Sequence, residues 1–283
     1  MTAHWPTVTI VGAGLIGGSA GLALADRRLA DRIIGVGRSE ASLATAQQRG
    51  AITEGTTDLA AGVAAADLVL VATRVGMIPQ LLEAIDAAVR PGTLLTDAGS
   101  TKQSIVTAWE QARESRRSRF VGSHPLAGSH QRGPQAATAD LFTNRLTILT
   151  PSPDTPRADV EAIGSFWTAL GSNLLELAPA EHDRLLAAAS HAPHVVAAAL
   201  AAATPTPARQ LTAGGWRDTT RIAAGDPELW ADILLDNATA VVTQIEQVSA
   251  ATEDLRAAIE AGDRTTLIRL LTHAKEIRDA LGS

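Results

Sequence analysis

Residues 8–18 read VTIVGAGLIGG, and this stretch decides the fold of the chain. An apolar, β-branched run passes into three glycines with the G-x-G-x-x-G spacing of a dinucleotide-binding turn. Glycine is needed there because the chain turns sharply, its N–H groups approach a pyrophosphate, and the next helix packs closely on the strand. A helical pattern over 15–29 follows, which distinguishes the stretch from an ordinary Gly-rich turn. The residues that we expect to contact the cofactor here are Gly12, Gly14, Leu15, Ile16 and Gly17.

Up to about residue 150, short apolar runs alternate with helical patterns. The runs lie at 8–11, 32–36, 68–72, 93–96, 120–121 and 146–149. Such alternation is typical of an α/β domain in which helices cover both faces of a parallel sheet. We therefore expect a Rossmann-type, doubly wound parallel sheet.

The stretch PSPDTP at 151–156 interrupts this pattern. Three prolines so close together neither pair in a central strand nor continue a helix. We expect the domain boundary there, with a dinucleotide-binding domain at 1–152 and an all-helical substrate and dimerisation domain at 153–283.

The second half is rich in alanine and leucine at helical spacing, apart from a possible strand at 173–177. Helices that cannot bury all their apolar faces within one chain commonly bury them against a second copy. We expect a homodimer formed through this domain. The expected helices cover about 180–203, 227–260 and 263–281.

Composition argues against several classes of function. A net charge of −6 over 283 residues gives no electrostatic footprint for nucleic acid. We find no apolar run of the ~18 residues that would cross a membrane. No signal peptide precedes the first strand, so we expect a cytoplasmic protein. Cysteine is absent, and His182, His191 and His194 lack a clear thiolate or carboxylate partner, so we expect no metal site.

The residues after the second strand bear on the choice of cofactor. An NAD site usually has an acidic residue there, which binds the ribose 2′-hydroxyl. Here the sequence is IGVGRS at 34–39, and Arg38 with Ser39 offers a cation and a hydroxyl to a 2′-phosphate. We therefore expect NADP rather than NAD; the alternative is that Arg38 is merely exposed and Glu40 contacts the ribose. Thr73, which follows the third main apolar run, is also expected to contact the cofactor.

Two polar loops follow apolar runs of the sheet, at the edge where a parallel sheet binds its ligands. They are DAGSTK at 97–102 and SHPLAG at 123–128. His124 is a candidate base because imidazole titrates near ~6.5 and a hydroxyl partner fixes its tautomer. The alternative is a histidine that only caps a loop. Lys102 is a weaker candidate for contact with a carboxylate.

Two further motifs lie in the helical half. They are SHAPH at 190–194 and GGWRDTTRIA at 214–223. Two arginines on either side of Asp218 suit recognition of a carboxylate, since a guanidinium is planar and permanently charged. The alternative is a structural ion pair between Asp218 and one of them.

Together, these motifs resemble those of the prephenate/arogenate dehydrogenase family of tyrosine biosynthesis. The resemblance runs from about residue 7 to about residue 250, and the order and spacing of the motifs match. It implies a nucleotide-binding domain, a helical dimerisation domain and an active site in the cleft between them.

The resemblance also implies a role for each matching residue. His124 is the catalytic base that takes a proton from the ring alcohol as hydride leaves for NADP+, and Ser100 orients its imidazole. Arg221 holds a substrate carboxylate, with Asp218 to aim it, and His194 lines the substrate pocket. Loss of CO2 is then driven by aromatisation, so the protein needs only to hold the dianion in place.

One position departs from the family pattern. His130 follows SHPLAGS where many relatives have an acidic residue. A carboxylate there would favour the amine of arogenate and repel a keto acid, whereas a histidine would not. We therefore expect oxidation of prephenate to 4-hydroxyphenylpyruvate, with oxidation of arogenate to tyrosine as the alternative.

Two other functions stay open at this point. Another NADP-dependent dehydrogenase, acting on β-hydroxy acids or pyrroline carboxylate, would use a catalytic lysine or lack the histidine at the sheet edge. A non-catalytic NADP-binding sensor would need no base. The chain leaves no room for an attached regulatory domain or fused mutase, so we expect a monofunctional enzyme.

Overall fold

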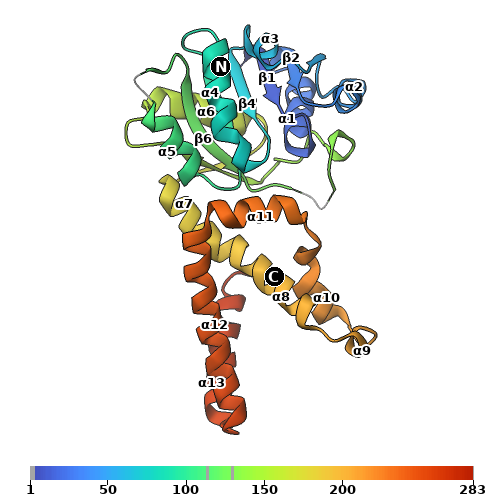
Figure 1. The fold of residues 1–283 in the computed structure, drawn as a ribbon, viewed down its shortest axis with the longest axis vertical. Coiled ribbons are helices and arrows are strands. Elements are labelled where there is room, and N and C mark those ends of the chain that lie inside the picture. The colour runs from blue at the N-terminus through green and yellow to red at the C-terminus, as the bar shows by residue number, and fades with distance from the viewer. Residues whose placement is uncertain (1–3, 113–114, 129–130, 283) are drawn as a thin grey trace.

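A computed structural model describes residues 4–112, 115–128 and 131–282 of the chain. A sheet domain and a helical domain lie one above the other, with helix α11 (Pro227–Asp236) directly beneath the sheet domain (Figure 1). The cleft between the two domains is bounded by the carboxyl ends of the first strands and by this helix.

The sheet has eight strands in the order β3-β2-β1-β4-β5-β6-β7-β8. From β3 to β6 it is parallel and has the strand order of a Rossmann fold, as expected. The strands are β1 (Trp5–Val11), β2 (Ala30–Val36), β3 (Glu54–Thr56), β4 (Leu68–Val71), β5 (Leu94–Asp97), β6 (Arg119–Pro125), β7 (Leu146–Thr150) and β8 (Asn173–Glu176).

The strand β7 departs from the expected parallel arrangement. It runs antiparallel to β6, and β8 then pairs parallel to β7. A parallel pair needs a crossover that returns the chain to the opposite edge, usually a helix. In its described part, the connection from β6 to β7 holds only the short helix η3 (Pro134–Ala136), so β7 starts at the edge where β6 ends.

Helices cover both faces of the sheet, and each face has its own buried core. On one face, Phe166 and Trp167 of α6 pack with residues of α1 and β1. On the other, Ile85 of α4 and Trp109 of α5 pack with the valines of β4. The helices of this domain are α1 (Leu15–Asp26), α2 (Glu40–Gln48), α3 (Leu59–Val63), η1 (Val75–Met77), α4 (Ile78–Ala88), α5 (Gln103–Gln111) and α6 (Arg157–Ala169).

The sheet domain extends beyond the expected boundary at residues 152 and 153. Both α6 and β8 follow the proline-rich stretch, yet α6 contributes to the core of the sheet and β8 is its last strand. The expected boundary is therefore too early. The prolines form a surface loop between β7 and α6, and the change to helical structure comes only after β8.

The helical domain begins with one long continuous helix, Pro179–Ala203. It consists of α7 (Pro179–Leu186), a π-helical turn η4 (Ala187–His191) and α8 (Ala192–Ala203). The π turn lies just before Pro193, which cannot donate a backbone hydrogen bond to the preceding turn. The remaining helices are α9 (Thr206–Arg209), α10 (Gly214–Thr220), η5 (Arg221–Ala224), α11, α12 (Ala238–Glu260) and α13 (Arg264–Asp279).

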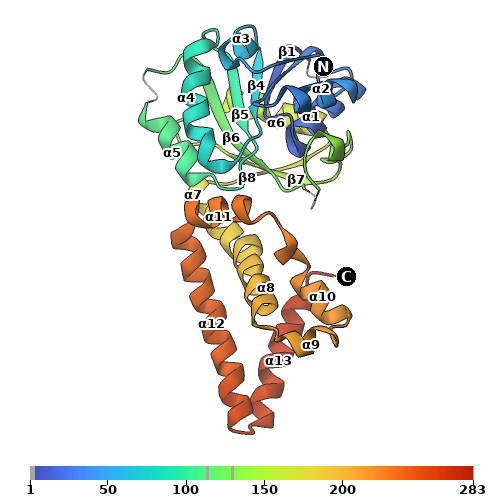
Figure 2. The same cartoon turned by 45° about the vertical axis from the view of Figure 1, so that its right-hand side comes forward.

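The helix expected at 227–260 is broken at Asn237, which separates α11 from α12. The buried amide of Asn237 donates to the backbone oxygen of Asp183 at 2.8 Å and lies 3.1 Å from Nδ1 of His191. These contacts hold the corner against the long helix. Beyond it, α12 and α13 lie side by side and project away from the sheet domain (Figure 2).

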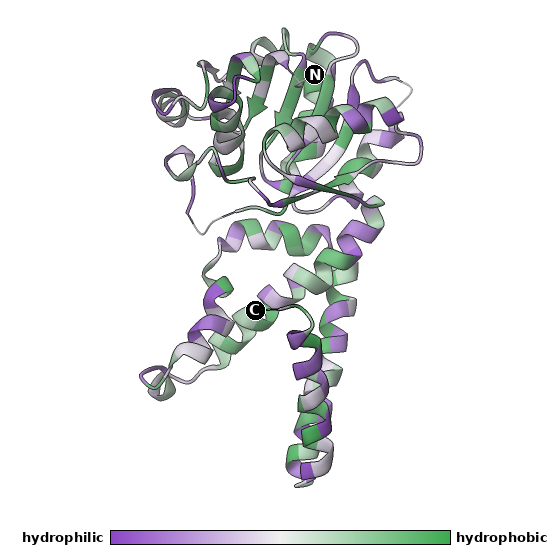
Figure 3. Ribbon diagram, turned by 180° about the vertical axis from the view of Figure 1, so that it is seen from behind, coloured by the Kyte–Doolittle hydropathy of each residue, from purple (hydrophilic) through white to green (hydrophobic). Residues whose placement is uncertain are grey.

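Many apolar side chains of the helical domain are exposed in the single chain. Figure 3 shows hydrophobic residues along α8, α12 and α13. Val242 and Leu271 are each more than half exposed, and Ile259 is 64% exposed. Surfaces of this kind mark interaction sites in soluble proteins, which agrees with the expected dimer.

The segment Pro179–Ala203 also corrects one expectation from the sequence. By length and composition this helix could cross a membrane, contrary to our prediction that no apolar run is long enough to do so. A single helix of this kind is weak evidence for a membrane span. Here it carries the buried His182 and His191 and packs against the other helices of its domain.

Candidate active site

A cavity of about 390 Å³ lies in the interdomain cleft. Its lining brings together residues that the sequence predicted separately, from four strand ends of the sheet and from the start of α11. The predicted residues that line it are Leu15, Ile16, Thr73, Ser100 and His124.

The glycine turn next to this cavity has the backbone that the sequence requires. Gly12 has a φ of +99°, and a Cβ atom there would lie 2.4 Å from the backbone oxygen of Ala72. A Cβ atom on Gly17 would lie 2.2 Å from the backbone oxygen of Gly12. By contrast, a Cβ atom on Gly14 would meet nothing within 4 Å. Gly14 therefore faces open space at the N-terminus of α1, where a pyrophosphate can approach the backbone.

Arg38 and Ser39 follow β2, at the same edge of the sheet. Ser39 caps α2, since its Oγ accepts a hydrogen bond of 3.3 Å from the N–H of Ser42. Arg38 is exposed and makes no ion pair with any residue that the structure describes, and Glu40 is exposed in the first turn of α2. Neither Arg38 nor Ser39 lines the cavity.

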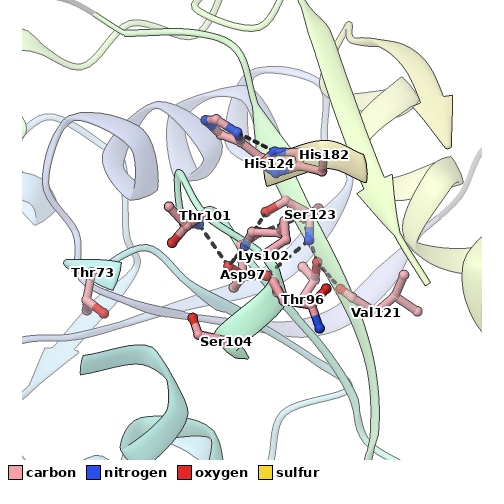
Figure 4. A network of polar contacts seen from close by, with 12 residues as sticks. Thr73, Thr96, Asp97, Thr101, Lys102, Ser104, Val121, Ser123, His124 and His182 are labelled. Carbon is pink, nitrogen blue, oxygen red and sulfur yellow. Dashed lines mark hydrogen bonds and ion pairs between the residues drawn. The ribbon is translucent and has the colours of Figure 1, made fainter. Parts of the chain in front are cut away.

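His124 is the last residue but one of β6 and lines the cavity, although only 9% of the residue is exposed. Its Nδ1 atom lies 2.9 Å from Nε2 of His182, and the two rings meet edge to face (Figure 4). Ser100 was expected to orient this imidazole. It lines the same cavity, but within the described part of the chain no hydrogen bond joins it to His124. His182, which we had not predicted for this role, takes that position.

The surroundings of His124 lower its pKa well below the usual value near 6.5. Burial is the largest cause, because it disfavours the charged imidazolium. Electrostatic repulsion from His182, Lys102 and His191 lowers the pKa of His124 further. His124 is therefore neutral at pH 7 and has a lone pair with which to accept a proton.

Behind His124, a buried ion pair within the loop 97–102 makes hydrogen bonds to the second predicted loop at Ser123 (Figure 4). The ammonium of Lys102 donates to the carboxylate of Asp97 and, at 3.1 Å, to the backbone oxygen of Ser123. Asp97 also accepts from the N–H groups of Gly99 at 2.8 Å and Ser123 at 3.0 Å. Lys102 is fully buried, and the burial lowers its pKa even though Asp97 raises it. Lys102 thus holds the loops together and is not directed at a ligand.

His194 was expected to line the substrate pocket, but it is buried on α8 and does not itself line the cavity. Its ring stacks on Trp230 with 3.6 Å between centroids, and Trp230 lines the cavity. The Nδ1 atom of His194 is buried without a hydrogen-bond partner among the described residues. Gly225 allows this arrangement, since a Cβ atom there would lie 2.5 Å from Nε1 of Trp230. Trp230 was not predicted as a site residue, because a lone tryptophan in a helical pattern resembles a core residue.

The structure does not bring Arg221 and Asp218 to the cavity of the single chain. Both are exposed, on η5 and α10, and neither lines the cavity. The cations that do line it are Arg74 and Arg132. They form ion pairs across the cleft, with Glu228 at 2.6 Å and Asp226 at 2.8 Å respectively. The predicted substrate residue His130 lies outside the described residues.

Comparison with known proteins identifies the family of the chain. A family model described as "Prephenate dehydrogenase, nucleotide-binding domain" matches residues 20–176, and one described as "Prephenate dehydrogenase, dimerization domain" matches residues 178–273. The chain belongs to the prephenate dehydrogenase family. The two matches meet where β8 ends, which supports the later domain boundary.

Individual relatives cover most of the chain. Prephenate dehydrogenase of Bacillus subtilis is 36% identical in an alignment of 282 residues that covers 97% of this chain and 76% of the relative. A crystal structure of prephenate dehydrogenase from A. aeolicus, in complex with hydroxyphenyl propionate and NAD+, has a TM-score of 0.91 and 28% identity over 99% of this chain and 100% of that one. Arogenate dehydrogenase from Synechocystis has a TM-score of 0.83 and 30% identity over 97% and 99% of the two chains.

Family membership confirms the main predictions from the sequence. The chain is an NAD(P)-dependent oxidoreductase with a Rossmann-type domain followed by a helical one. The match to a dimerization domain supports a homodimer formed through the helical half. It also argues against the β-hydroxy acid and pyrroline carboxylate dehydrogenases that the sequence had left open.

Proposed function

We propose that this enzyme oxidises and decarboxylates prephenate to 4-hydroxyphenylpyruvate, with transfer of hydride to NADP+. One observation carries the proposal: a neutral, buried His124 lines a cavity that also reaches the glycine turn. This arrangement supports a site at which a base and a bound hydride acceptor would meet. The similarity to prephenate dehydrogenases over nearly the whole chain supports the substrate class.

The glycine turn fits a nicotinamide dinucleotide, because Gly14 leaves open space at the N-terminus of α1. When bound, the nicotinamide supplies the acceptor for hydride. Gly12, Gly14, Gly17, Leu15 and Ile16 would hold the pyrophosphate, and Thr73 lines the adjoining wall of the cavity.

His124 acts on the hydroxyl of the ring. It takes the proton from oxygen while hydride leaves the carbon, and this general-base step needs a lone pair directed into the cavity. Ser100 lines the same cavity, and its proposed partner is the substrate hydroxyl. No protein group is needed to break the C–C bond, since aromatisation drives the loss of CO2.

Carboxylate recognition is assigned to the helical side of the cleft. Here, the Nδ1 atom of His194 is buried without a hydrogen-bond partner among the described residues, and its ring stacks on Trp230, which lines the cavity. Arg221 with Asp218 stays our proposed carboxylate clamp. Its exposed position means that this role requires either a shift of η5 towards the cleft or a site completed in the dimer.

The choice of substrate is tested by kcat/KM for prephenate and for arogenate, in the wild type and in the His130→Glu variant. We expect prephenate to be preferred and the variant to shift the preference towards arogenate, because a carboxylate attracts the amine and repels the keto acid. A wild type that prefers arogenate, together with an unchanged preference in the variant, would contradict this. Similarity to the Synechocystis arogenate dehydrogenase makes arogenate the second candidate substrate.

The choice of cofactor is tested by the Arg38→Ala variant. We expect kcat/KM for NADP+ to fall by about 10–100-fold, because a charge-assisted hydrogen bond contributes about 1.5–3 kcal/mol. The value for NAD+ in the same variant is the control and should hardly change. An NAD+ preference in the wild type that survives the substitution would overturn the proposed role of Arg38.

Two expectations from the sequence stay predictions. The alternative of a non-catalytic NADP-binding sensor is distinguished by turnover, since a sensor would reduce no cofactor with either substrate. The cytoplasmic location awaits a direct measurement.

A further inference from the structure

Three buried side chains lie in a row behind the cavity. His124 contacts His182, with 2.9 Å between Nδ1 and Nε2, and His182 contacts Asp183, with 2.8 Å between Nδ1 and Oδ1. His182 is fully buried and Asp183 is 5% exposed. The row starts in the sheet domain and ends on α7 of the helical domain.

The far end of the row determines the direction of every hydrogen bond in it. The carboxylate of Asp183 accepts from the N–H of Lys102 at 2.8 Å and from the N–H of Gln103 at 2.9 Å. A backbone N–H can only donate, so both oxygens of Asp183 act as acceptors. A carboxylate has no proton to donate, so the Nδ1 atom of His182 carries the proton and donates a hydrogen bond to Asp183.

The position of the proton on His182 in turn determines which nitrogen of His124 carries a proton. A neutral His182 with its proton on Nδ1 has a lone pair on Nε2, which accepts from Nδ1–H of His124. The proton of neutral His124 is then on Nδ1, and its lone pair is on Nε2. His124 lines the cavity, so this is the tautomer that can take a proton from a bound hydroxyl.

We propose that His182 and Asp183 are positioning residues that hold His124 in its Nδ1-protonated tautomer, so that Nε2 is free to act as the base. This inference rests on the proposed function for the step that His124 performs. The tautomer itself does not depend on the identity of the substrate. Ser100, the expected partner, cannot supply this constraint from its observed position.

The row also accommodates the charge that forms during the reaction. When Nε2 of His124 takes a proton, the imidazolium donates through Nδ1–H to His182, whose other nitrogen is bonded to the anionic Asp183. Among the described residues, the other titratable groups that face His124 are Lys102 before α5 and His191 on η4, and both disfavour the cation. Asp97 is bonded to Lys102. Asp183 is thus the anion connected to His124 by hydrogen bonds.

A consequence is that His124 is held in this tautomer only when α7 of the helical domain is docked on the sheet domain. His182 and Asp183 belong to α7, whereas His124 and the capped N-terminus of α5 belong to the sheet domain. A sheet domain without α7 would keep the glycine turn and lose the constraint on the base.

The direct test is 15N NMR of the histidine side chains in the full-length protein. We expect His124 in the wild type to be neutral at pH 7 with its proton on Nδ1, and to become a mixture of tautomers in His182→Leu. A wild-type His124 with its proton on Nε2 would overturn the inference. This measurement needs no substrate, so it is independent of the proposed function.

The kinetic test compares His182→Leu with His182→Gln. Leucine cannot accept a hydrogen bond from His124, and we expect kcat to fall about 10²-fold with little change in KM for the cofactor. Glutamine has a carbonyl oxygen at a similar reach, so it should restore much of kcat. Wild-type kcat in the leucine variant, or equal losses in both, would contradict a positioning role.

Asp183 has two possible roles, since it accepts hydrogen bonds both from His182 and from the N-terminus of α5. A variant of Asp183 distinguishes the positioning of His124 from the capping of α5. Asp183→Asn removes the anion, so we expect the acid limb of kcat/KM to move to lower pH, because the imidazolium of His124 loses stabilisation. Loss of the cap alone would reduce stability without moving this limb. The control is Glu181→Gln, which changes an exposed carboxylate on the same helix, paired with Arg184.

Failure of the inference and failure of the proposed function give different results. If the wild type does not turn over prephenate, the proposed function fails while the tautomer measurement still decides the inference. If the wild type turns over prephenate, and the acid limb of kcat/KM lies at the same pH in Asp183→Asn and in Glu181→Gln, the inference is wrong while the proposed function holds.

Discussion

Replacing the proposed base should abolish most of the activity without affecting cofactor binding. In His124→Asn, we expect kcat to fall by about 10²–10⁴-fold, because general-base catalysis contributes that much to proton transfer. Asparagine keeps a polar group at the end of β6 but cannot accept a proton at neutral pH. Steady-state kinetics with prephenate and calorimetric titration of the cofactor measure the two effects separately.

The matched control is His4→Asn. His4 is an exposed histidine next to the start of β1, where it contacts Asp31, and it lies at the opposite edge of the sheet from the cavity. This variant should keep wild-type kinetics. Full activity in His124→Asn would show that His124 is not the catalytic base. A loss of cofactor affinity as large as the loss of kcat would mean that the histidine only supports the shape of the site.

Breaking the buried ion pair behind the site should have the largest effect on stability. In Lys102→Met, Asp97 loses its cationic partner at a position with no solvent access, and we expect the free energy of unfolding to fall by about 3–5 kcal/mol. Methionine approximates the length of the lysine side chain, so the loss reports the stranded charge more than a cavity. Urea denaturation at pH 7 measures the change.

Lys275→Met is the control, because Lys275 pairs with Asp279 on the exposed surface of α13. Exposed ion pairs contribute little, so its stability should hardly change. The double variant Lys102→Met with Asp97→Asn should be more stable than Lys102→Met alone, since it removes the uncompensated charge. A Lys102→Met protein as stable as the wild type would show that the pair is not essential to the loops.

Local chemistry made the glycine turn predictable from sequence. The φ of +99° at Gly12 and the close approach of the chain at Gly17 exclude side chains at both positions, so the motif is read directly from residue identity. The position of His124 was also predictable, because a polar loop that follows a parallel strand lies at the ligand-binding edge of the sheet.

Features that depend on distant parts of the chain were not predictable in this way. The segment 181–183 reads Glu-His-Asp within a helical pattern, which is typical of a solvated helix face. Only the docking of α7 on the sheet domain brings His182 to His124, which is 58 residues away in sequence. The adjacent histidine and aspartate were the available signal.

The error at the domain boundary has a similar cause. A proline-rich loop ends a strand, but it does not show whether the next helix packs on the same sheet. The aromatic residues Phe166 and Trp167 of α6, both fully buried against it, could have indicated that it does.

The most direct test of the central claim is the product stoichiometry of a single reaction. The purified enzyme is incubated with prephenate and NADP+, and the amounts of reduced cofactor, CO2 and 4-hydroxyphenylpyruvate are measured together. We predict equal amounts of all three in the wild type and almost none in His124→Asn. Reduced cofactor without CO2, or no reduction with any combination of prephenate, arogenate, NAD+ and NADP+, would contradict the account.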